Sequence, residues 1–258
     1  MPSKKIVVGM VHLKPLPGSP RFAGDLAAIS EAALRDADAL QQGGVDAIML
    51  ENFGDIPFFK GAVPQHTVAN ITAIAAAVVK RVSVPVGINV LRNDGCAALS
   101  IVAAVGARMI RVNVLTAARV TDQGVIEGIS AELLRLKALL GAKDVQIFAD
   151  IDVKHSAPLA PRPIEEEVAD TVERGGADVL IVSGTGTGKP TDPAMAERVK
   201  AAAPHTPVYI GSGITIDTIA AFGDHADGFI VGTHFKVGGR VDEPVDVERV
   251  KRFVERCR

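Results

Sequence analysis

Eight short apolar segments recur along the chain at intervals of about thirty residues, the length of one strand plus one crossover helix. This spacing constrains the fold more than any other feature. The segments are rich in β-branched residues and apolar nearly throughout, which is typical of parallel strands covered on both faces. The predicted strands are Ile6–Leu13, Asp46–Glu51, Val84–Val90, Met109–Asn113, Val145–Ile151, Asp178–Ser183, Val208–Gly211 and Gly228–Val231.

Ala-rich segments with helical spacing lie between these strands. Asp192-Pro193 predicts a helix start, because an N-cap residue is followed by proline at the first helical position. The glycine pairs at 43–44 and 175–176 predict helix ends. The predicted helices are Leu26–Gln42, His66–Lys80, Gly95–Ala104, Ser130–Leu140, Ile164–Arg174, Pro193–Ala202, Ile216–Phe222 and Val247–Arg256.

Repeated β-α units form either a closed barrel or a doubly wound open sheet, and the glycine-rich ends of the last two strands favour the barrel. In many barrels the loops after strands seven and eight present backbone N–H groups to a phosphate. We therefore predict an α/β fold, a single (β/α)8 TIM barrel over residues 1–258. The alternative role of these glycines is to make tight turns. The predicted phosphate-binding residues are Gly211, Ser212, Gly213, Gly232 and Thr233.

The fifth predicted strand ends in Phe148-Ala-Asp-Ile-Asp-Val-Lys-His155 and is the most informative segment. In an extended strand Asp150, Asp152 and Lys154 share one face, directed at the barrel axis. Burying three ionisable groups is costly unless they pair with one another, a metal or a ligand. An inert structural pair of aspartate and lysine is the alternative. The predicted catalytic residues are Glu51, Asp150, Asp152 and Lys154.

Further polar residues stand at the carboxyl ends of predicted strands, where the active sites of barrels lie. Each of them alone is as well explained as a turn cap or a rim residue, so the prediction depends on their convergence. Glu51, Asp150 and Asp152 are also hard oxygen ligands suited to Mg²⁺ or Mn²⁺, although their spacing is no metal signature. The predicted substrate-binding residues are His12, Asn89, Arg111 and Asn113, with Asn52 beside them.

The stretch Ser183-Gly-Thr-Gly-Thr-Gly-Lys-Pro190 is similar to a nucleotide-binding loop but matches neither of two known motifs. The first glycine of a P-loop falls on Ser183, and the third glycine of a dinucleotide fingerprint falls on Lys189. The segment is nevertheless rich in donors. We predict that Lys189 binds an anionic substrate, with a plain surface turn as the alternative.

Composition restricts the partners and the compartment. The net charge is −2 and no long basic run occurs, so we expect no nucleic-acid partner. No apolar run is long enough, and free enough of glycine and charge, to span a bilayer. The two cysteines, Cys96 and Cys257, are too few for a disulfide framework, and the first residues lack a signal-peptide pattern. We expect a cytoplasmic protein.

Several strings also point to a family: Gly9-Met-Val-His-Leu-Lys-Pro-Leu-Pro-Gly-Ser-Pro-Arg21, Leu50-Glu-Asn-Phe-Gly-Asp55, Gly87-Ile-Asn-Val-Leu-Arg-Asn-Asp94, Arg111-Val-Asn113, Ala149-Asp-Ile-Asp-Val-Lys-His155 and Ser183-Gly-Thr-Gly186. In order, and over essentially the whole chain, they resemble the BtpA/SgcQ family. The resemblance implies a barrel of the superfamily that binds ribose phosphates. It implies either a factor for photosystem I biogenesis or stability, or an enzyme of sugar or nucleoside metabolism.

The leading hypothesis is an enzyme that acts on a phosphorylated sugar or a ribosyl or nucleoside-type compound. Cleavage of a glycosidic or N-ribosidic bond by two carboxylates is slightly favoured, because three acids and two asparagines suit a polyhydroxylated substrate. The first alternative is lysine-assisted chemistry by an aldolase, lyase or isomerase, with Lys154 as the cation or imine former. The second is a non-enzymatic scaffold, whose role would survive Asp150→Asn and Asp152→Asn. Residues 116–128 form a long connection, predicted to be a lid or a contact in a homo-oligomer.

Overall fold

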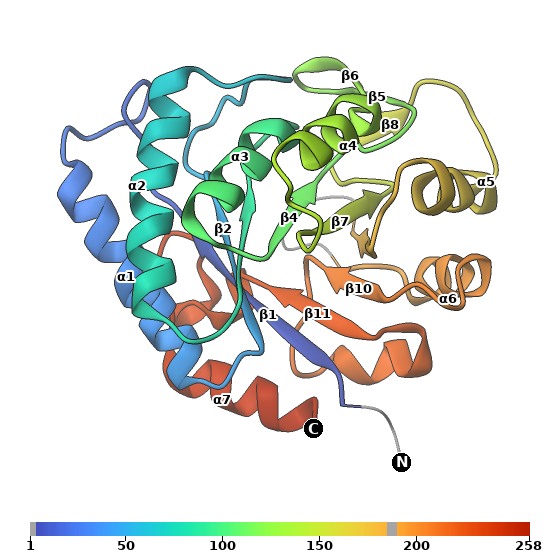
Figure 1. The fold of residues 1–258 in the computed structure, drawn as a ribbon. Coiled ribbons are helices and arrows are strands. Elements are labelled where there is room, and N and C mark those ends of the chain that lie inside the picture. Colours follow the sequence, from blue (N-terminus) through green and yellow to red (C-terminus); the bar gives the residue numbers. More distant parts are fainter. Residues whose placement is uncertain (1–3, 185–189) are drawn as a thin grey trace.

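The computed structural model describes residues 4–184 and 190–258. Within this part of the chain, eight parallel strands close into a barrel and helices cover its outside (Figure 1). The predicted (β/α)8 barrel is therefore confirmed. Around the barrel the order is β1 (Ile6–His12), β11 (Gly228–Val231), β10 (Val208–Gly211), β9 (Val179–Ser183), β7 (Gln146–Ile151), β4 (Met109–Val112), β3 (Val86–Asn89) and β2 (Ala47–Glu51).

The helices follow the strands as the alternation predicts, with boundaries that differ by a few residues. Local capping explains several starts: Asp25, Asp94, Asp192 and Asp246 each accept a hydrogen bond from a backbone N–H of the first turn. The α-helices are α1 (Leu26–Gln42), α2 (Gln65–Arg81), α3 (Gly95–Val105), α4 (Ser130–Leu139), α5 (Ile164–Ala169), α6 (Pro193–Ala202) and α7 (Val247–Arg256).

Two predicted helices differ from the structure. The helix predicted at Ile164–Arg174 changes after α5 into the π-helix η1 (Asp170–Arg174). The α-helix predicted at Ile216–Phe222 is wrong, since the chain there forms the 3₁₀ helix η2 (Ile219–His225). Its backbone is interrupted at Gly223, where φ is +45°. After β11 the chain adds two short 3₁₀ turns, η3 (Thr233–Phe235) and η4 (Val237–Gly239), before α7.

A small antiparallel sheet, absent from the prediction, lies near the carboxyl ends of β4 and β7 (Figure 1). Its strands are β5 (Ala118–Thr121), β6 (Gly124–Glu127) and β8 (Ser156–Pro158). The long connection at 116–128 is thus a β-hairpin, and β5 joins it to the segment that follows β7. Whether the hairpin is a lid or an oligomer contact stays a prediction.

The barrel interior is filled by side chains from alternate strand positions, as the period of two requires. A cluster of ten buried residues forms this inner core, and a much larger apolar cluster joins the strands to the helices outside. The helices of residues 4–184 and 190–258 all lack the combination of length and apolarity that a bilayer-spanning segment needs. The inner core is Val8, Met10, Ala47, Met49, Met109, Phe148, Val179, Ile181, Tyr209 and Ile230.

Candidate active site

The register of the parallel strands brings four polar residues into one row above the inner core. His12 of β1 pairs with Glu51 of β2, Glu51 pairs with Asn89 of β3, and Asn89 pairs with Arg111 of β4. In each strand the polar residue follows the interior-facing positions at the strand period of two, so its side chain lies on the same face as theirs. The predicted convergence of these side chains at the carboxyl ends of the strands is therefore a feature of the fold.

Asp150 of β7 lies at the centre of a hydrogen-bonded group, called here the Asp150 cluster, which comprises Asn89, Arg111, Asn113 and Asp150. Arg111 donates to both Asp150 oxygens, from Nε at 3.0 Å and from Nη2 at 2.8 Å. Asn113 Nδ2 donates to Asp150 Oδ2 at 2.8 Å. Asn89 Nδ2 donates to the Arg111 carbonyl oxygen at 3.1 Å. A bidentate pair with a further amide donor holds the carboxylate rigidly.

Burial is nearly complete in this cluster. The Asp150 side chain is 0% exposed and that of Arg111 is 4% exposed. Burial by itself lowers the pKa of Arg111, but the charge and hydrogen bonds of Asp150 outweigh it, so the pKa is raised. Arg111 therefore stays a cation, and it also lies 4.0 Å from Glu51, between Nη1 and Oε2.

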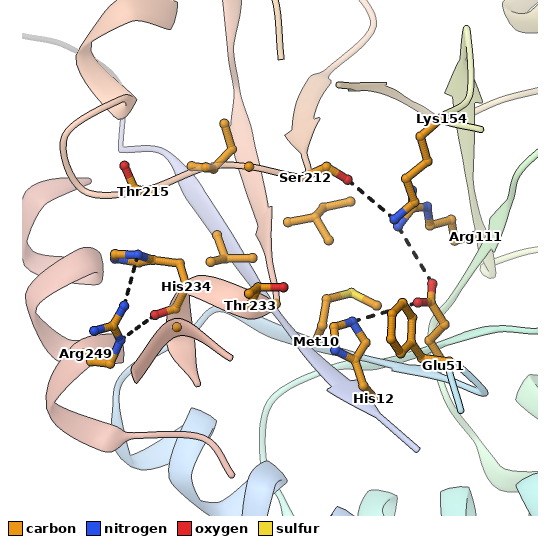
Figure 2. Close-up of a pocket in the computed structure, with 17 residues that line it drawn as sticks. Met10, His12, Glu51, Arg111, Lys154, Ser212, Thr215, Thr233, His234 and Arg249 are labelled. Carbon is orange, nitrogen blue, oxygen red and sulfur yellow. Dashed lines mark hydrogen bonds and ion pairs between the residues drawn. The ribbon is translucent and has the colours of Figure 1, made fainter. Parts of the chain in front are cut away.

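A cavity of about 300 Å³ opens above this level, and its lining comes from strands on opposite sides of the barrel. Figure 2 shows Arg249, His234 and Thr215 on one side, and Glu51, Arg111 and Lys154 on the other. The lining residues are Met10, His12, Glu51, Phe53, Arg111, Lys154, Ser212, Gly213, Ile214, Thr215, Ile230, Val231, Gly232, Thr233, His234, Gly239 and Arg249.

The turns after β10 and β11 form one side of the cavity, and their binding of phosphate stays a prediction. Ser212 and Gly213 both have positive φ, +65° and +64°. Thr191 Oγ1 donates to the Gly211 carbonyl at 2.9 Å, which fixes the end of β10. At Gly232 an added Cβ would lie 2.6 Å from His12 Cε1, so only glycine fits against that ring. Of the five predicted phosphate-binding residues, Gly211 alone is absent from the described lining.

Arg249 of α7 adds a cation to this side and was not among the predicted residues. Its Nε donates to the His234 carbonyl at 2.6 Å, and its Nη2 lies 3.5 Å from His234 Nδ1. Burial, with help from the Arg249 charge, lowers the pKa of His234. The sequence holds no local signal for this arginine, because it reaches the cavity only through the two 3₁₀ turns that return the chain from β11.

Glu51 and His12 face each other across the first two strands. His12 Nε2 lies 3.8 Å from Glu51 Oε1, and the Glu51 side chain is 4% exposed. Burial, followed by the charges of Lys236, Lys154 and Arg111, lowers the pKa of His12 well below its ordinary value. Within the described residues His12 Nδ1 is buried without a hydrogen-bond partner. This imidazole is therefore neutral near pH 7.

Lys154 follows β7 and extends into the same cavity (Figure 2). Its Nζ lies 3.5 Å from Ser212 Oγ, so it connects the charged side of the cavity with the β10 turn. Burial lowers the pKa of Lys154, and the attraction of Glu51 offsets part of that effect. A lowered pKa increases the fraction of neutral amine, which is the form that acts as a base or nucleophile.

Asp152 does not share a face with Asp150 and Lys154, contrary to the prediction. β7 ends at Ile151, and Asp152 has a positive φ of +51° that turns its side chain away. The Asp152 side chain is 48% exposed and pairs with Arg119 of β5, whose other partners are Ser156 and Glu167. Asp152 thus anchors the small sheet. Strand alternation failed because the argument required an extended chain as far as Lys154, whereas β7 ends at Ile151.

The predicted metal ligands do not converge either. Glu51 lines the cavity, Asp150 is committed to Arg111 and Asn113, and Asp152 lies outside. In residues 4–184 and 190–258 no group of three His, Cys, Asp or Glu side chains is arranged to hold a metal ion. Asn52 proves to be a bridge between loops, since its Oδ1 accepts from Leu91 N–H at 2.7 Å. Lys189 lies outside the described residues.

A closed parallel barrel with charged groups and glycine turns at the carboxyl ends of its strands defines the TIM-barrel class. N-(5'-phosphoribosyl)anthranilate isomerase from Pyrococcus furiosus has the same fold, with a TM-score of 0.61 at 13% identity over 98% of each chain. The chain belongs to the BtpA family, whose family model matches residues 3–258.

Two relatives show how far this family extends. "Photosystem I biogenesis protein BtpA" of Synechocystis is 47% identical over 249 residues, which cover 96% of this chain and 86% of the relative. "Putative sgc region protein SgcQ" of Escherichia coli is 33% identical over 256 residues, which cover 98% and 94%. The resemblance noted in the sequence is thereby confirmed.

Proposed function

We propose that the protein is an enzyme acting on a phosphorylated sugar or ribosyl compound through Lys154 and Glu51. The observation that carries the proposal is a single cavity with two chemically different sides. One side has the glycine and hydroxyl turns after β10 and β11 and the guanidinium of Arg249, and the other has a carboxylate beside a buried amine.

The first side suits a phosphate group. Ser212, Thr215 and Thr233 supply hydroxyl groups, and the glycines let the main chain approach an anion closely. Arg249 supplies a charge and a planar fork of donors that matches phosphate oxygens. A phosphate held here leaves the rest of a small substrate directed toward Lys154.

The second side favours lysine-assisted chemistry over cleavage by two carboxylates. Glu51 is a lining carboxylate, whereas Asp150 is 0% exposed and fully engaged by Arg111 and Asn113. A two-carboxylate hydrolysis therefore lacks its second acid within the described lining. Lys154 can stabilise an enolate or form an imine with a substrate carbonyl, and Glu51 can move the proton. This geometry best supports an aldolase, lyase or isomerase.

The test is proton exchange at the carbon next to a substrate carbonyl. Dihydroxyacetone phosphate and ribulose 5-phosphate are incubated with the protein in D₂O and followed by NMR. We expect exchange with at least one of them, reduced about 100-fold or more by Lys154→Met. Lys143→Met, at an exposed lysine, is the matched control.

Borohydride reduction of the same mixtures separates the two roles of Lys154. A mass adduct on Lys154 supports the imine, and exchange without an adduct supports enolate stabilisation. Absence of both with a panel of sugar phosphates counts against the proposed function.

A second candidate is a non-catalytic biogenesis factor, favoured by the name of the Synechocystis relative at 47% identity. Because Asp150 is bound by Arg111 and Asn113, we expect its loss to disturb the fold, so Asp150→Asn is a poor discriminator. The double variant Lys154→Met with Glu51→Gln is better. In the test, both proteins are expressed in a cyanobacterium that lacks its own BtpA-family protein, and the recovery of photosystem I is measured. If the protein is a scaffold, the wild type and the double variant restore photosystem I equally. Restoration by the wild type alone supports the enzyme.

A further inference from the structure

A second cavity, of about 550 Å³, adjoins the first and shares Glu51, Phe53 and Lys154 with it. The turn of the β5–β6 hairpin lines it with Asp122 and Gln123. Because Lys154 lines both cavities, a substrate bound at Lys154 can extend into both of them. The remaining lining is Ile56, Phe58, Leu91, Arg92 and His155.

Arg92 is the unusual member of this lining. The residue is 4% exposed, yet the hydrogen bond of its side chain within the described residues is from Nη2 to the backbone carbonyl of Lys154. No described carboxylate forms an ion pair with it, in contrast to Arg111, which Asp150 binds through two contacts. Burying a guanidinium without a carboxylate is unfavourable unless a ligand supplies the missing negative charge.

The electrostatic surroundings of Arg92 agree with this geometry. Burial lowers its pKa, and the attraction of Asp150 offsets part of the effect while Arg111 adds to it. Arg92 and Lys154 face Glu51 and Asp122 around the same cavity, so the formal charges of these four side chains cancel. Such a site suits one negative charge better than the two of a phosphate, and the guanidinium fork matches a carboxylate.

We propose that Arg92 binds a carboxylate of the substrate, so that the substrate carries a phosphate at one end and a carboxylate at the other. This inference rests on the proposed function, because it takes the phosphate to lie beside Arg249 and the reacting carbon beside Lys154. It narrows the substrate class to phosphorylated sugar acids and related phosphorylated carboxylic acids. Ile56, Phe58 and Leu91 contact the carbon atoms next to the carboxylate.

The experiment compares two ligands that differ only at the far end of a six-carbon chain. 6-Phosphogluconate carries a carboxylate there and glucitol 6-phosphate carries a hydroxymethyl group. Calorimetric titration of the wild type is expected to show about 10- to 100-fold tighter binding of 6-phosphogluconate, the ordinary effect of a hydrogen-bonded charge pair. Arg92→Gln is expected to remove this preference and leave the affinity for glucitol 6-phosphate unchanged.

Two further variants keep the test decisive. Arg92→Lys retains the charge without the fork and is expected to keep a reduced preference, so it serves if Arg92→Gln fails to fold. Arg108→Gln changes an exposed arginine before β4, at the other end of the barrel, and is expected to keep the full preference. Equal affinities in the wild type, or an undiminished preference in Arg92→Gln, overturn the carboxylate site.

Failure of the proposed function gives a different result. If neither phosphorylated compound binds, the phosphate side fails, and gluconate alone then decides on Arg92. Gluconate binding that depends on Arg92 retains the carboxylate site without the phosphate, and no gluconate binding rejects it.

Discussion

The Asp150 cluster and three basic residues that line the two cavities, His12, Arg92 and Lys154, place similar side chains in opposite surroundings. In the cluster, Arg111 has a carboxylate and a fixed geometry, and its pKa is raised. His12, Arg92 and Lys154 are also largely buried, but there burial is the main effect and lowers the pKa of each. The charges of the cluster are therefore paired within the protein, whereas among the described residues the three basic residues lack a close carboxylate partner, which a ligand can supply.

Within one barrel, some buried charged residues are therefore paired with each other, and others are left for a ligand to pair with. A buried ion pair that is complete resists change, because removal of either member leaves the other unpaired. A buried cation without a counter-charge lowers the stability of the folded state, and a ligand that supplies the counter-charge removes this cost. Three predictions test this difference between paired and unpaired buried charges.

The largest expected effect is the loss of Asp150. Asp150→Asn keeps the shape of the side chain but removes the hydrogen-bonded carboxylate of the buried Arg111 guanidinium and leaves it only the more distant Glu51, at 4.0 Å, as a described counter-charge. We expect the free energy of unfolding to fall by about 3–5 kcal/mol, measured by urea denaturation at pH 7. Asp152→Asn, at the half-exposed carboxylate two residues later, is the control, with an expected loss of about 1 kcal/mol or less. Equal losses in the two variants would contradict a special role for the cluster.

The second effect is a pH dependence from His12. Its pKa in the folded protein is lowered, so between that pKa and the ordinary value of 6.5 the unfolded chain binds a proton that the folded chain does not. Stability from this residue is thus full above pH 6.5 and falls as the pH drops, by at most about 1.4 kcal/mol per pH unit.

His12→Gln should flatten the slope of unfolding free energy between pH 7.5 and 5.5. His205→Gln, at an exposed histidine, should leave the slope unchanged. A slope that His12→Gln does not alter would mean that the folded protein accommodates the charged imidazole.

The smallest effect on stability is expected at Arg92. Arg92→Met removes a buried charge that has no described ion-pair partner, so the unfolding free energy should change by about 1 kcal/mol or less, or rise. Arg111→Met leaves Asp150 buried without its arginine partner, so it should lower the unfolding free energy several times as much. A large loss from Arg92→Met would show that Arg92 is structural and would weaken its assignment as a ligand-binding residue.

Much of the fold was predictable, because apolar periodicity and strand spacing are local properties. Each of the eight predicted strands contains or overlaps a barrel strand of the described chain. The small sheet was missed, since β5, β6 and β8 are short and only their mutual pairing makes them strands. The predicted helix at Ile216–Phe222 failed for a related reason, because a 3₁₀ turn and an α-helix share the same short apolar pattern.

The candidate site was predictable in position but not in its details. Strand ends identified Glu51, Lys154 and the turns after β10 and β11, since parallel strands deliver their carboxyl ends to one face. Arg92 and Arg249 were not found, because each reaches the cavity from a loop or helix whose path depends on packing.

The sequence by itself determined the barrel, the family and the face on which polar groups gather, because these follow from periodicity and from the order of elements. Only the tertiary structure decided how the charges are paired. Asp150 and Asp152 are two residues apart, yet one is enclosed by Arg111 and the other turns outward to Arg119. That choice depends on where β7 ends and on which side chains arrive from distant strands, and both are set by three-dimensional packing.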